Sequence, residues 1–303
     1  MDNLTHSLAG ALLGQIGLKR LSGRAMPTLI IAANLPDIDA VVAFSSSGLA
    51  LRRGITHGPI ALALLPLVLT GLVIVWHRWR PRPDGTPVRP AALLLLAYVG
   101  TLSHPALDWL NSYGIRLLEP FSSKWFAGDT LFIIDIWLWI ALIGGVWVSL
   151  RRERTGRGDA TRPAIAAFAA ICAYIFANGL ITGHAERAAS ARLADMRIAP
   201  TLVVAQPVPV QFWQRDLLWR DAATYGSGRF HVGTDQLGLY EGVALRLDDP
   251  RLAALATRPD VAAFLFWSRM PIVVDDEAGR PLLTDQRFAS GPARGRFAIP
   301  LDE

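Results

Sequence analysis

Long apolar runs dominate the first 183 residues of this chain and constrain its fold more than any other feature. The clearest run, residues 58–76, contains no charged residue. About 20 apolar residues in a helix cross the hydrocarbon core of a bilayer. Hydrophobic residues make up 52% of the chain and charged residues 18%, whereas a soluble domain has about 25% charged residues. We therefore predict an integral membrane protein.

Five further segments have the length or composition of a membrane helix, which gives about six in total. They are residues 4–18, 26–44, 91–110, 131–150 and 163–183. The first is short for a span, so it is either tilted or begins inside the protein. The predicted fold class is an all-α polytopic membrane helical bundle.

Basic residues are distributed unequally between the two sides of this predicted bundle. Twelve lie on one side: Lys19, Arg20, Arg24, Arg78, Arg80, Arg82, Arg89, Arg151, Arg152, Arg154, Arg157 and Arg162. Four lie in the loops on the other side: Arg52, Arg53, Arg116 and Lys124. Because cytoplasmic loops carry the excess of Lys and Arg, we expect a bacterial inner-membrane protein with its N-terminus and its C-terminal part in the periplasm. The first residues lack the basic region of a cleavable signal peptide.

The C-terminal part of the sequence has the composition of a soluble domain. Residues 201–210 and 271–283 are predicted strands, the latter forming a hairpin that turns around residues 276–279. Residues 250–256 and 260–267 have helical spacing. We expect a membrane domain at residues 1–185 and a small extramembrane α+β domain at residues 186–303, whose protein partner the sequence does not indicate.

Seven ionisable residues fall within or at the edges of the predicted spans, where each costs about 2.5–3.5 kcal/mol to insert. They are His6, Asp37, Asp39, His57, His104, Asp108 and Asp135. The spans contain no Lys or Arg, so the sequence offers these carboxylates no basic partner and predicts that they are either protonated or bound to a cation. All seven fall near the predicted outer face. Asp and His together suit a divalent metal, zinc first and manganese second.

The spacing of these residues carries further information. His104 and Asp108 are four residues apart and share one face of a helix. Asp37 and Asp39 do not, but Pro36 should break the helix and turn both carboxylates toward one site. Three alternatives stay open. His6 could be an ordinary terminal residue, Asp129 could either join the site or cap a helix that begins near Thr130, and His184 with Glu186 could add a ligand.

Several other chemistries are excluded. The single cysteine, Cys172, rules out an internal disulfide and a zinc site built from several cysteines. The net charge is +5, but most arginines flank apolar runs as the positive-inside rule requires. We therefore expect no nucleic-acid partner. The sequence has neither a phosphate-binding loop nor a Gly-x-Ser-x-Gly nucleophile motif.

Short motifs in residues 1–185 resemble the YdjM-type family of inner-membrane metal-dependent hydrolases. They are Thr5-His6-Ser7 with Gly10, Leu35-Pro36-Asp37-Ile38-Asp39, Arg53-Gly54-Ile55-Thr56-His57, Ser103-His104 with Asp108, Asn111-Ser112-Tyr113-Gly114, and Trp125-Phe126 with Gly128-Asp129 and Asp135. The resemblance implies a membrane-bound metal-dependent hydrolase.

The order of the ligands is also similar to that in zinc-dependent phospholipase C and P1-type nucleases. That likeness implies that His57, His104 and Asp108 hold one metal, that Asp37 or Asp39 bridges or acts as the base, and that His6 contributes to a second metal. The membrane segments lack the later His-x-x-x-Glu pair of those enzymes, so one or two ions are expected.

Together these observations predict hydrolysis by metal-activated water, with Asp37 or Asp39 as the catalytic base. A site just below the outer surface favours a phosphoester-containing or lipid substrate from the bilayer. One alternative is an ion or small-solute transporter that uses the same His/Asp cluster, although the apolar inner halves of the spans disfavour it. A metal-stabilised scaffold is another.

Overall fold

The computed structural model describes residues 1–42, 45–81, 85–290 and 293–302, and its chain forms two compact units. Residues 1–40 and 53–177 form a helical unit, and residues 41–52 and 178–303 form a unit that contains β-sheets. The boundary that we expected after residue 185 falls inside one continuous helix, α7 (Arg162–Asp195).

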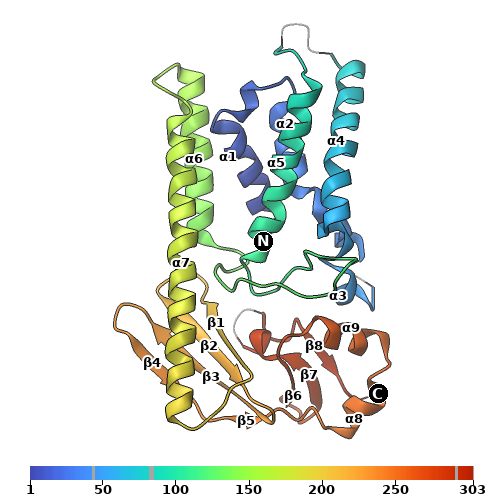
Figure 1. The fold of residues 1–303 in the computed structure, drawn as a ribbon, viewed down its shortest axis with the longest axis vertical. Helices are drawn as coiled ribbons and strands as arrows, with labels where there is room; N and C mark the ends of the chain where they lie inside the picture. The colour runs from blue at the N-terminus through green and yellow to red at the C-terminus, as the bar shows by residue number, and fades with distance from the viewer. Residues whose placement is uncertain (43–44, 82–84, 291–292, 303) are drawn as a thin grey trace. The chain divides into compact units, whose positions relative to one another are not determined.

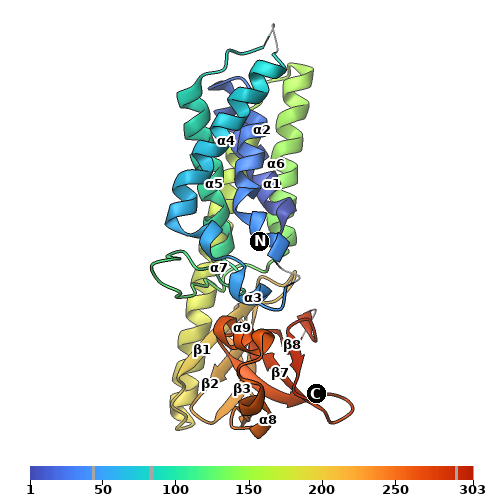
Figure 2. The same cartoon turned by 90° about the vertical axis from the view of Figure 1, so that its right-hand side faces the viewer.

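The helical unit is a bundle of near-parallel and antiparallel helices (Figures 1 and 2). Its helices are α1 (Asn3–Gln15), α2 (Ala25–Asn34), α4 (Pro59–Trp79), α5 (Pro90–Trp109), α6 (Ile136–Thr155) and the first part of α7. Short 3₁₀ segments lie at Leu18–Arg20, Leu35–Val42 and Ile55–His57. Pro59 and Pro90 begin their helices because a proline in the first turn loses no hydrogen bond.

Four segments in the described part of the chain are long and apolar enough to cross a membrane: Ala25–Val42, Pro59–Trp79, Pro90–Trp109 and Arg162–Asp195. The six expected spans are therefore not confirmed. Helix α1 has 13 residues, which extend about 20 Å at 1.5 Å per residue against a core of about 30 Å. Helix α6 ends in a charged turn, residues 151–154, that shortens its apolar part.

The expected helix at residues 131–150 begins later than predicted. Helix α6 starts at Ile136, and Asp135 is its N-cap rather than a residue one turn inside it. The Asp135 carboxylate accepts a hydrogen bond of 2.9 Å from the backbone N–H of Leu138. A carboxylate is well suited to this position because it satisfies a free N–H and interacts favourably with the helix dipole.

The segment before α6 has no helix, so the interpretation of Asp129 as a cap was wrong. The backbone N–H groups of Thr130 and Leu131 both donate to the carbonyl of Leu110, at the end of α5. This segment thereby satisfies a carbonyl that the end of a helix leaves free. Asp129 itself is buried and has a left-handed backbone, with φ at 47°.

Two glycines allow α2 to pack closely between α1 and α5. A Cβ atom at Gly10 of α1 would lie 2.7 Å from the carbonyl oxygen of Leu29. A Cβ atom at Gly100 of α5 would lie 2.9 Å from the same oxygen and 2.7 Å from Cβ of Ala32. Small residues allow such close backbone approach between membrane helices. These contacts fix the position of α2, and therefore of the 3₁₀ segment that follows it.

We predict that Gly10→Ala and Gly100→Ala each lower the thermal unfolding midpoint of the protein in detergent, because the added methyl group overlaps backbone atoms. An overpacked contact typically costs about 1–3 kcal/mol. Gly71→Ala is the matched control, since a Cβ atom there meets nothing within 4 Å. Equal midpoints for all three variants would show that the close packing is not needed.

In the second unit, a five-stranded antiparallel sheet packs against the last part of α7. Its strands are β1 (Leu202–Pro207), β2 (Gln214–Arg220), β3 (Thr224–His231), β4 (Gln236–Leu239) and β5 (Val243–Ala244). They have the order β1-β2-β3-β4, and β5 also pairs with β3. Ala185 and Ala189 of α7 are buried against Ala205, Leu217 and Phe230 of the sheet. We had predicted β1 but not β2 to β5.

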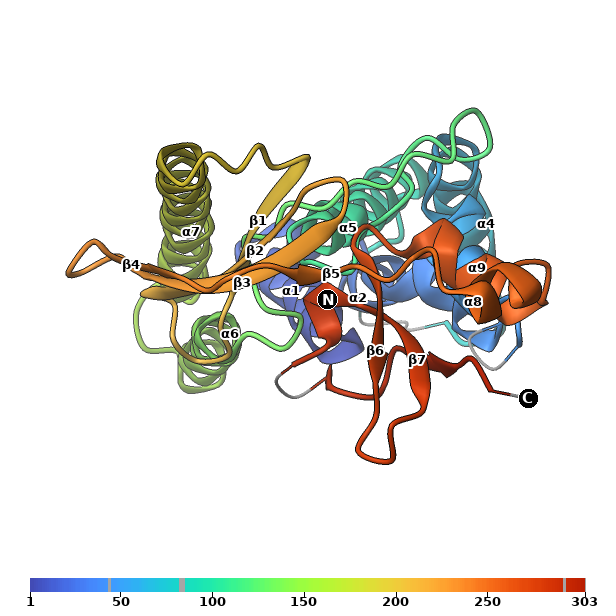
Figure 3. The same ribbon diagram turned by 90° about the horizontal axis from the view of Figure 1, so that it is seen from below.

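Besides a 3₁₀ segment at Gln286–Phe288, the described part of this unit contains three further strands and three short helices. They are α3 (Gly48–Leu51), α8 (Pro250–Leu255), α9 (Pro259–Trp267), β6 (Pro271–Asp275), β7 (Pro281–Asp285) and β8 (Ala298–Pro300). The predicted hairpin is present as β6 and β7 (Figure 3), and the two predicted helices are α8 and α9.

Burial alone would raise the pKa of Asp285, but the charge and hydrogen bonds of Arg287 lower this pKa below its ordinary value.

Candidate metal centre

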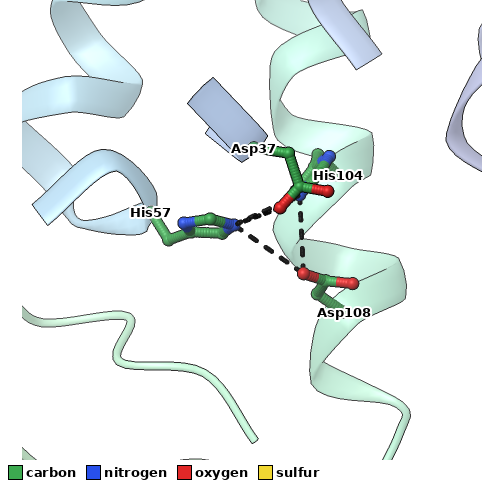
Figure 4. Close-up of side chains that lie close together, drawn as sticks. All are labelled: Asp37, His57, His104 and Asp108. Carbon is green, nitrogen blue, oxygen red and sulfur yellow. Dashed lines mark hydrogen bonds and ion pairs between the residues drawn. The ribbon is translucent and has the colours of Figure 1, made fainter. Parts of the chain in front are cut away.

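Four side chains of the helical unit meet at one point: Asp37, His57, His104 and Asp108 (Figure 4). The Nε2 atoms of His57 and His104 lie 3.2 Å apart. From Oδ1 of Asp37 these two nitrogens lie 3.9 and 3.7 Å away, and from Oδ2 of Asp108 they lie 3.7 and 3.4 Å away. All four donor atoms lie within 4.8 Å of one another.

These distances match the geometry of a tetrahedral metal site. Ligand atoms about 2.0–2.1 Å from a central ion, at the corners of a regular tetrahedron, lie about 3.3–3.4 Å from each other. The observed separations of 3.2 to 3.9 Å scatter around and slightly above this value. The residues present therefore fit a divalent ion with two nitrogen and two oxygen ligands.

Three separate segments supply the four ligands. His104 and Asp108 lie on one face in the last turns of α5, as their spacing predicted. His57 lies in the 3₁₀ turn just before α4, and Asp37 lies in the 3₁₀ segment that follows α2. The break after Asn34 agrees with the role that we predicted for Pro36. The group thus lies at one end of the helical unit.

Pro36 also influences which ring nitrogen of His104 carries a proton. At the end of α2 the Leu35 N–H donates to the carbonyl of Ala32. A proline has no N–H, so Pro36 cannot continue this pattern by donating to the carbonyl of Ala33. That carbonyl instead lies 2.7 Å from Nδ1 of His104. Because a carbonyl only accepts, His104 carries its proton on Nδ1, and its Nε2 presents a lone pair to the group.

His57 is oriented in the same way, by Thr56 and Asp39. The Thr56 hydroxyl donates to Oδ2 of Asp39 at 3.0 Å, and its oxygen lies 2.9 Å from Nδ1 of His57. The same Asp39 oxygen lies 3.4 Å from that nitrogen and accepts from the backbone N–H of Arg53 at 2.7 Å. His57 therefore donates through Nδ1 and presents the lone pair of Nε2. Asp39 thus lies on the Nδ1 side of the His57 ring and is not a member of the four-residue group.

Two imidazole lone pairs thus face each other across 3.2 Å, beside two carboxylates. Like partial charges so close in a buried site repel strongly unless a positive charge lies between them. Ligand histidines in metalloproteins typically donate their other ring nitrogen to a carbonyl or carboxylate, as both histidines do here. The hydrogen-bond pattern and the distances therefore agree on a cation site.

Asp108 has basic partners that the sequence analysis did not foresee. Nε of the buried Arg53 lies 3.0 Å from Oδ2, and its Nη2 donates to Oδ1 at 3.1 Å. The ammonium group of Met1 contacts Oδ1 as well. The prediction that the carboxylates lack basic partners was therefore wrong. Arg53 lies in a loop outside the spans and folds back, and its left-handed backbone, with φ at 52°, belongs to this tight turn.

Arg53 is held in place by several further contacts. Its Nη1 donates to Oδ1 of Asn111 at 3.1 Å and to the carbonyl of Gly114 at 3.3 Å. The guanidinium lies 4.8 Å above the centre of the Tyr113 ring. Its position in the Arg53–His57 motif, four residues before the candidate ligand His57, was the sequence signal that could have identified it.

His6 is also fully buried next to the group, without being one of its four members. Its ring stacks on His104 with centroids 3.7 Å apart, and its Nε2 lies 3.3 Å from Oδ1 of Asp108. Asp108 thus presents one oxygen to the four-residue group and the other to His6. A second ion that uses His6 stays a prediction.

The remaining candidates have other partners. Asp135 accepts from the Tyr174 hydroxyl at 3.1 Å in addition to its capping bond. His184 pairs with Asp235 at 3.1 Å on the surface of the second unit. Neither residue belongs to the four-residue group found among the described residues. These contacts do not support Asp135 or His184 as a metal ligand.

Comparison with known protein families identifies the family of this chain. The profile of the YdjM inner membrane protein family matches residues 1–185, well over half of the chain. The chain belongs to this family. It is also 27% identical over 156 residues to the uncharacterized protein YfhP of Bacillus subtilis, an alignment that covers 48% of this chain and 45% of that protein. The chain thus aligns with less than half of this curated relative.

No solved structure matches the chain. The YdjM match covers every residue of the four-residue group together with His6, Asp39 and Arg53. The likeness to phospholipase C and P1-type nucleases is not confirmed by any of these matches.

We predict that Arg53→Gln destabilises the protein by about 3–5 kcal/mol, since removing one partner of a buried ion pair leaves an uncompensated charge. Thermal unfolding of the purified protein in detergent measures the effect. Arg78→Gln removes the same charge from an exposed position of α4 and should leave the midpoint unchanged. If both variants unfold at the wild-type temperature, Arg53 does not stabilise Asp108.

Proposed function

We propose that this YdjM-family protein is a metal-dependent hydrolase of the bacterial inner membrane that acts on phosphoester-containing lipids. The observation that carries the proposal is the convergence of two imidazole nitrogens and two carboxylate oxygens within 4.8 Å of one another at one end of the helical unit. A set of two nitrogens and two oxygens at this spacing favours zinc, with manganese as the second choice.

Each residue near the ion has a separate task in this proposal. When bound, the divalent ion would act as a Lewis acid that lowers the pKa of water toward neutrality and polarises the ester. In this proposal His57, His104 and Asp108 would hold the ion, which leaves a fourth position for water. Asp37 is the proposed general base, because its side chain keeps 6% of its surface exposed while the other three keep 0%. Asp39 already accepts hydrogen bonds from Arg53 and Thr56, which suits it to orienting His57 instead.

The choice of a lipid substrate rests on the surroundings of the site. An exposed apolar side chain accompanies each part of the four-residue group: Ile38 beside Asp37, Ile55 near His57, and Trp109 beside Asp108. Their exposed fractions are 49%, 63% and 47%. Such a rim favours contact with acyl chains or with the head-group layer, where tryptophan is enriched. A phosphoester of a membrane lipid would then reach the ion without leaving the bilayer.

The first test is the metal content of the purified protein, together with its hydrolysis of a chromogenic phosphodiester and of phospholipid vesicles. We expect about one zinc or manganese ion per chain in the wild type, or two if His6 joins a second site. His104→Ala and Asp108→Ala should lose both the metal and the activity. Asp39→Asn should keep the fold but weaken metal affinity about 10–100-fold, as changes to groups that orient a ligand do.

His77→Ala serves as the control, since His77 lies near the opposite end of α4 from His57. A well-folded wild type that binds no divalent metal would contradict the proposal. Stoichiometric metal without hydrolysis of any phosphoester or lipid would transfer support to a transporter. Flux assays in vesicles would then test the transporter function.

We further propose that this site and the C-terminal unit face the periplasm, because the basic residues accumulate at the other end of the predicted spans. A reporter enzyme that is active only in the periplasm, fused after residue 303, should be active. A cytoplasmic reporter that is active at the same position would reverse the orientation and place the substrate in the inner leaflet.

A further inference from the structure

The helical unit contains a second polar feature, at the end away from the four-residue group. It is a pocket of about 340 Å³ where the turn between α1 and α2 meets the ends of α4 and α6. Its charged lining residues are Lys19, Arg20, Arg24 and Glu153, and His77 completes the polar part of the wall. We call this pocket the basic pocket.

Arg24 is the central residue of the basic pocket. Its side chain is about nine-tenths buried, and its buried Nε atom has no hydrogen-bond partner in the described structure. The guanidinium lies 4.1 Å above the ring of Trp76, and its Nη2 donates to the carbonyl of Arg80. A buried donor without a partner is costly. These contacts fix the Arg24 guanidinium in position at the pocket wall.

The pocket wall is fixed by contacts between two loops. The N–H of Gly23 donates to the carbonyl of Pro87 at 2.9 Å, and the N–H of Arg89 donates to the Ser22 hydroxyl at 2.9 Å. A Cβ atom at Gly23 would lie 2.2 Å from the carbonyl oxygen of Thr86. The two loops are thus in direct backbone contact. A pocket held this way needs little rearrangement to bind a ligand, which favours affinity.

The charges of the lining favour an anion. Lys19 pairs with Glu153 and donates to Oε1 of Gln15 at 3.0 Å, so these two lining charges offset each other. Arg20 and Arg24 remain as two positive charges, with Arg20 exposed at the rim. Arginine is suited to bidentate contacts with phosphate oxygens. The start of α2, at Ala25 and Met26, adds the positive end of a helix dipole.

We propose that the basic pocket binds a phosphate group, with Arg24 and Arg20 as its principal donors, and that this group belongs to an anionic phospholipid. Trp76, 38% exposed, stacks against Arg24 in the last turn of α4, where Trp79 is 80% exposed. Tryptophan at the end of a span marks the head-group level of the bilayer, and basic pockets between membrane helices bind anionic head groups. The proposal is independent of the hydrolase, because none of the four-residue group lines this pocket.

The test is a binding titration of the delipidated full-length protein by native mass spectrometry. The probes are phosphatidylglycerol, phosphatidylcholine and inorganic phosphate. We expect wild type to prefer phosphatidylglycerol over phosphatidylcholine. Arg20→Gln and Arg24→Gln should each weaken phosphatidylglycerol binding about fivefold, the usual effect of one basic residue near an anionic head group. Arg78→Gln, an exposed arginine of α4 outside the pocket lining, should have no effect.

Arg20→Gln keeps the experiment decisive if Arg24→Gln fails to fold, since Arg20 is exposed. Inorganic phosphate that competes with the lipid at similar affinity would assign the pocket to free phosphate, which overturns the lipid part of the proposal. Equal binding of the two lipids by wild type would overturn the proposal as a whole, and so would equal effects of the Arg20 and Arg78 variants. Metal content and hydrolysis should be unchanged in Arg20→Gln, so failure here leaves the hydrolase proposal intact.

Discussion

The repulsion between two imidazole lone pairs is the constraint on which the rest of the site depends. His57 and His104 each use Nδ1 to donate to a fixed acceptor, so their Nε2 atoms meet as acceptors across 3.2 Å. Asp37 and Asp108 add negative charge to the same small volume. A bound cation, or a proton held between the two rings, would relieve this arrangement. Arg53 offsets part of the negative charge by contacting both oxygens of Asp108.

The arrangement depends in turn on how closely the helices pack. Gly10 and Gly100 allow the backbone of α2 to approach α1 and α5 at the level of Leu29. One helical turn later, Ala33 is within hydrogen-bond distance of His104, and Pro36 redirects the chain so that Asp37 joins the group. A packing contact without polar atoms therefore sets the positions of two ligands. Positioning of ligands by rigid elements is what a metal site requires.

Much of the site could be predicted from the sequence because its signals are local. Charged residues inside apolar runs drew attention to Asp37, His104 and Asp108, and the i,i+4 spacing placed two of them on one helix face. Arg53 could not be predicted in its role, since a loop arginine gives no sign that it folds back over 55 residues of sequence to meet Asp108. Asp135 was misplaced for a related reason. Hydropathy locates an apolar run but does not reveal that its first residues pair with the end of α5 as an irregular segment.

The fold shows the same division between local and distant information. The hairpin of β6 and β7 and the helices α8 and α9 follow from turn residues and periodicity within short windows. Strands β2 to β5 are stabilised by pairing across the sheet and carry polar residues such as Gln214, Arg215 and Asp216, so their composition gave no clear signal. Among the described residues four segments qualify as candidate spans, because α1 and α6 do not supply enough uncharged helical length.

The distribution of the four-residue group over three segments has a consequence for how the protein would acquire a metal. His57 precedes α4, Asp37 follows α2, and the other two ligands lie on α5. Only the pair on α5 exists before the helices associate, and two ligands hold an ion weakly compared with four. Tight capture of an ion would therefore belong to the assembled bundle, and its binding free energy would add to the stability of that assembly. Metal supply during biosynthesis would then influence how much of the chain survives as folded protein in the membrane.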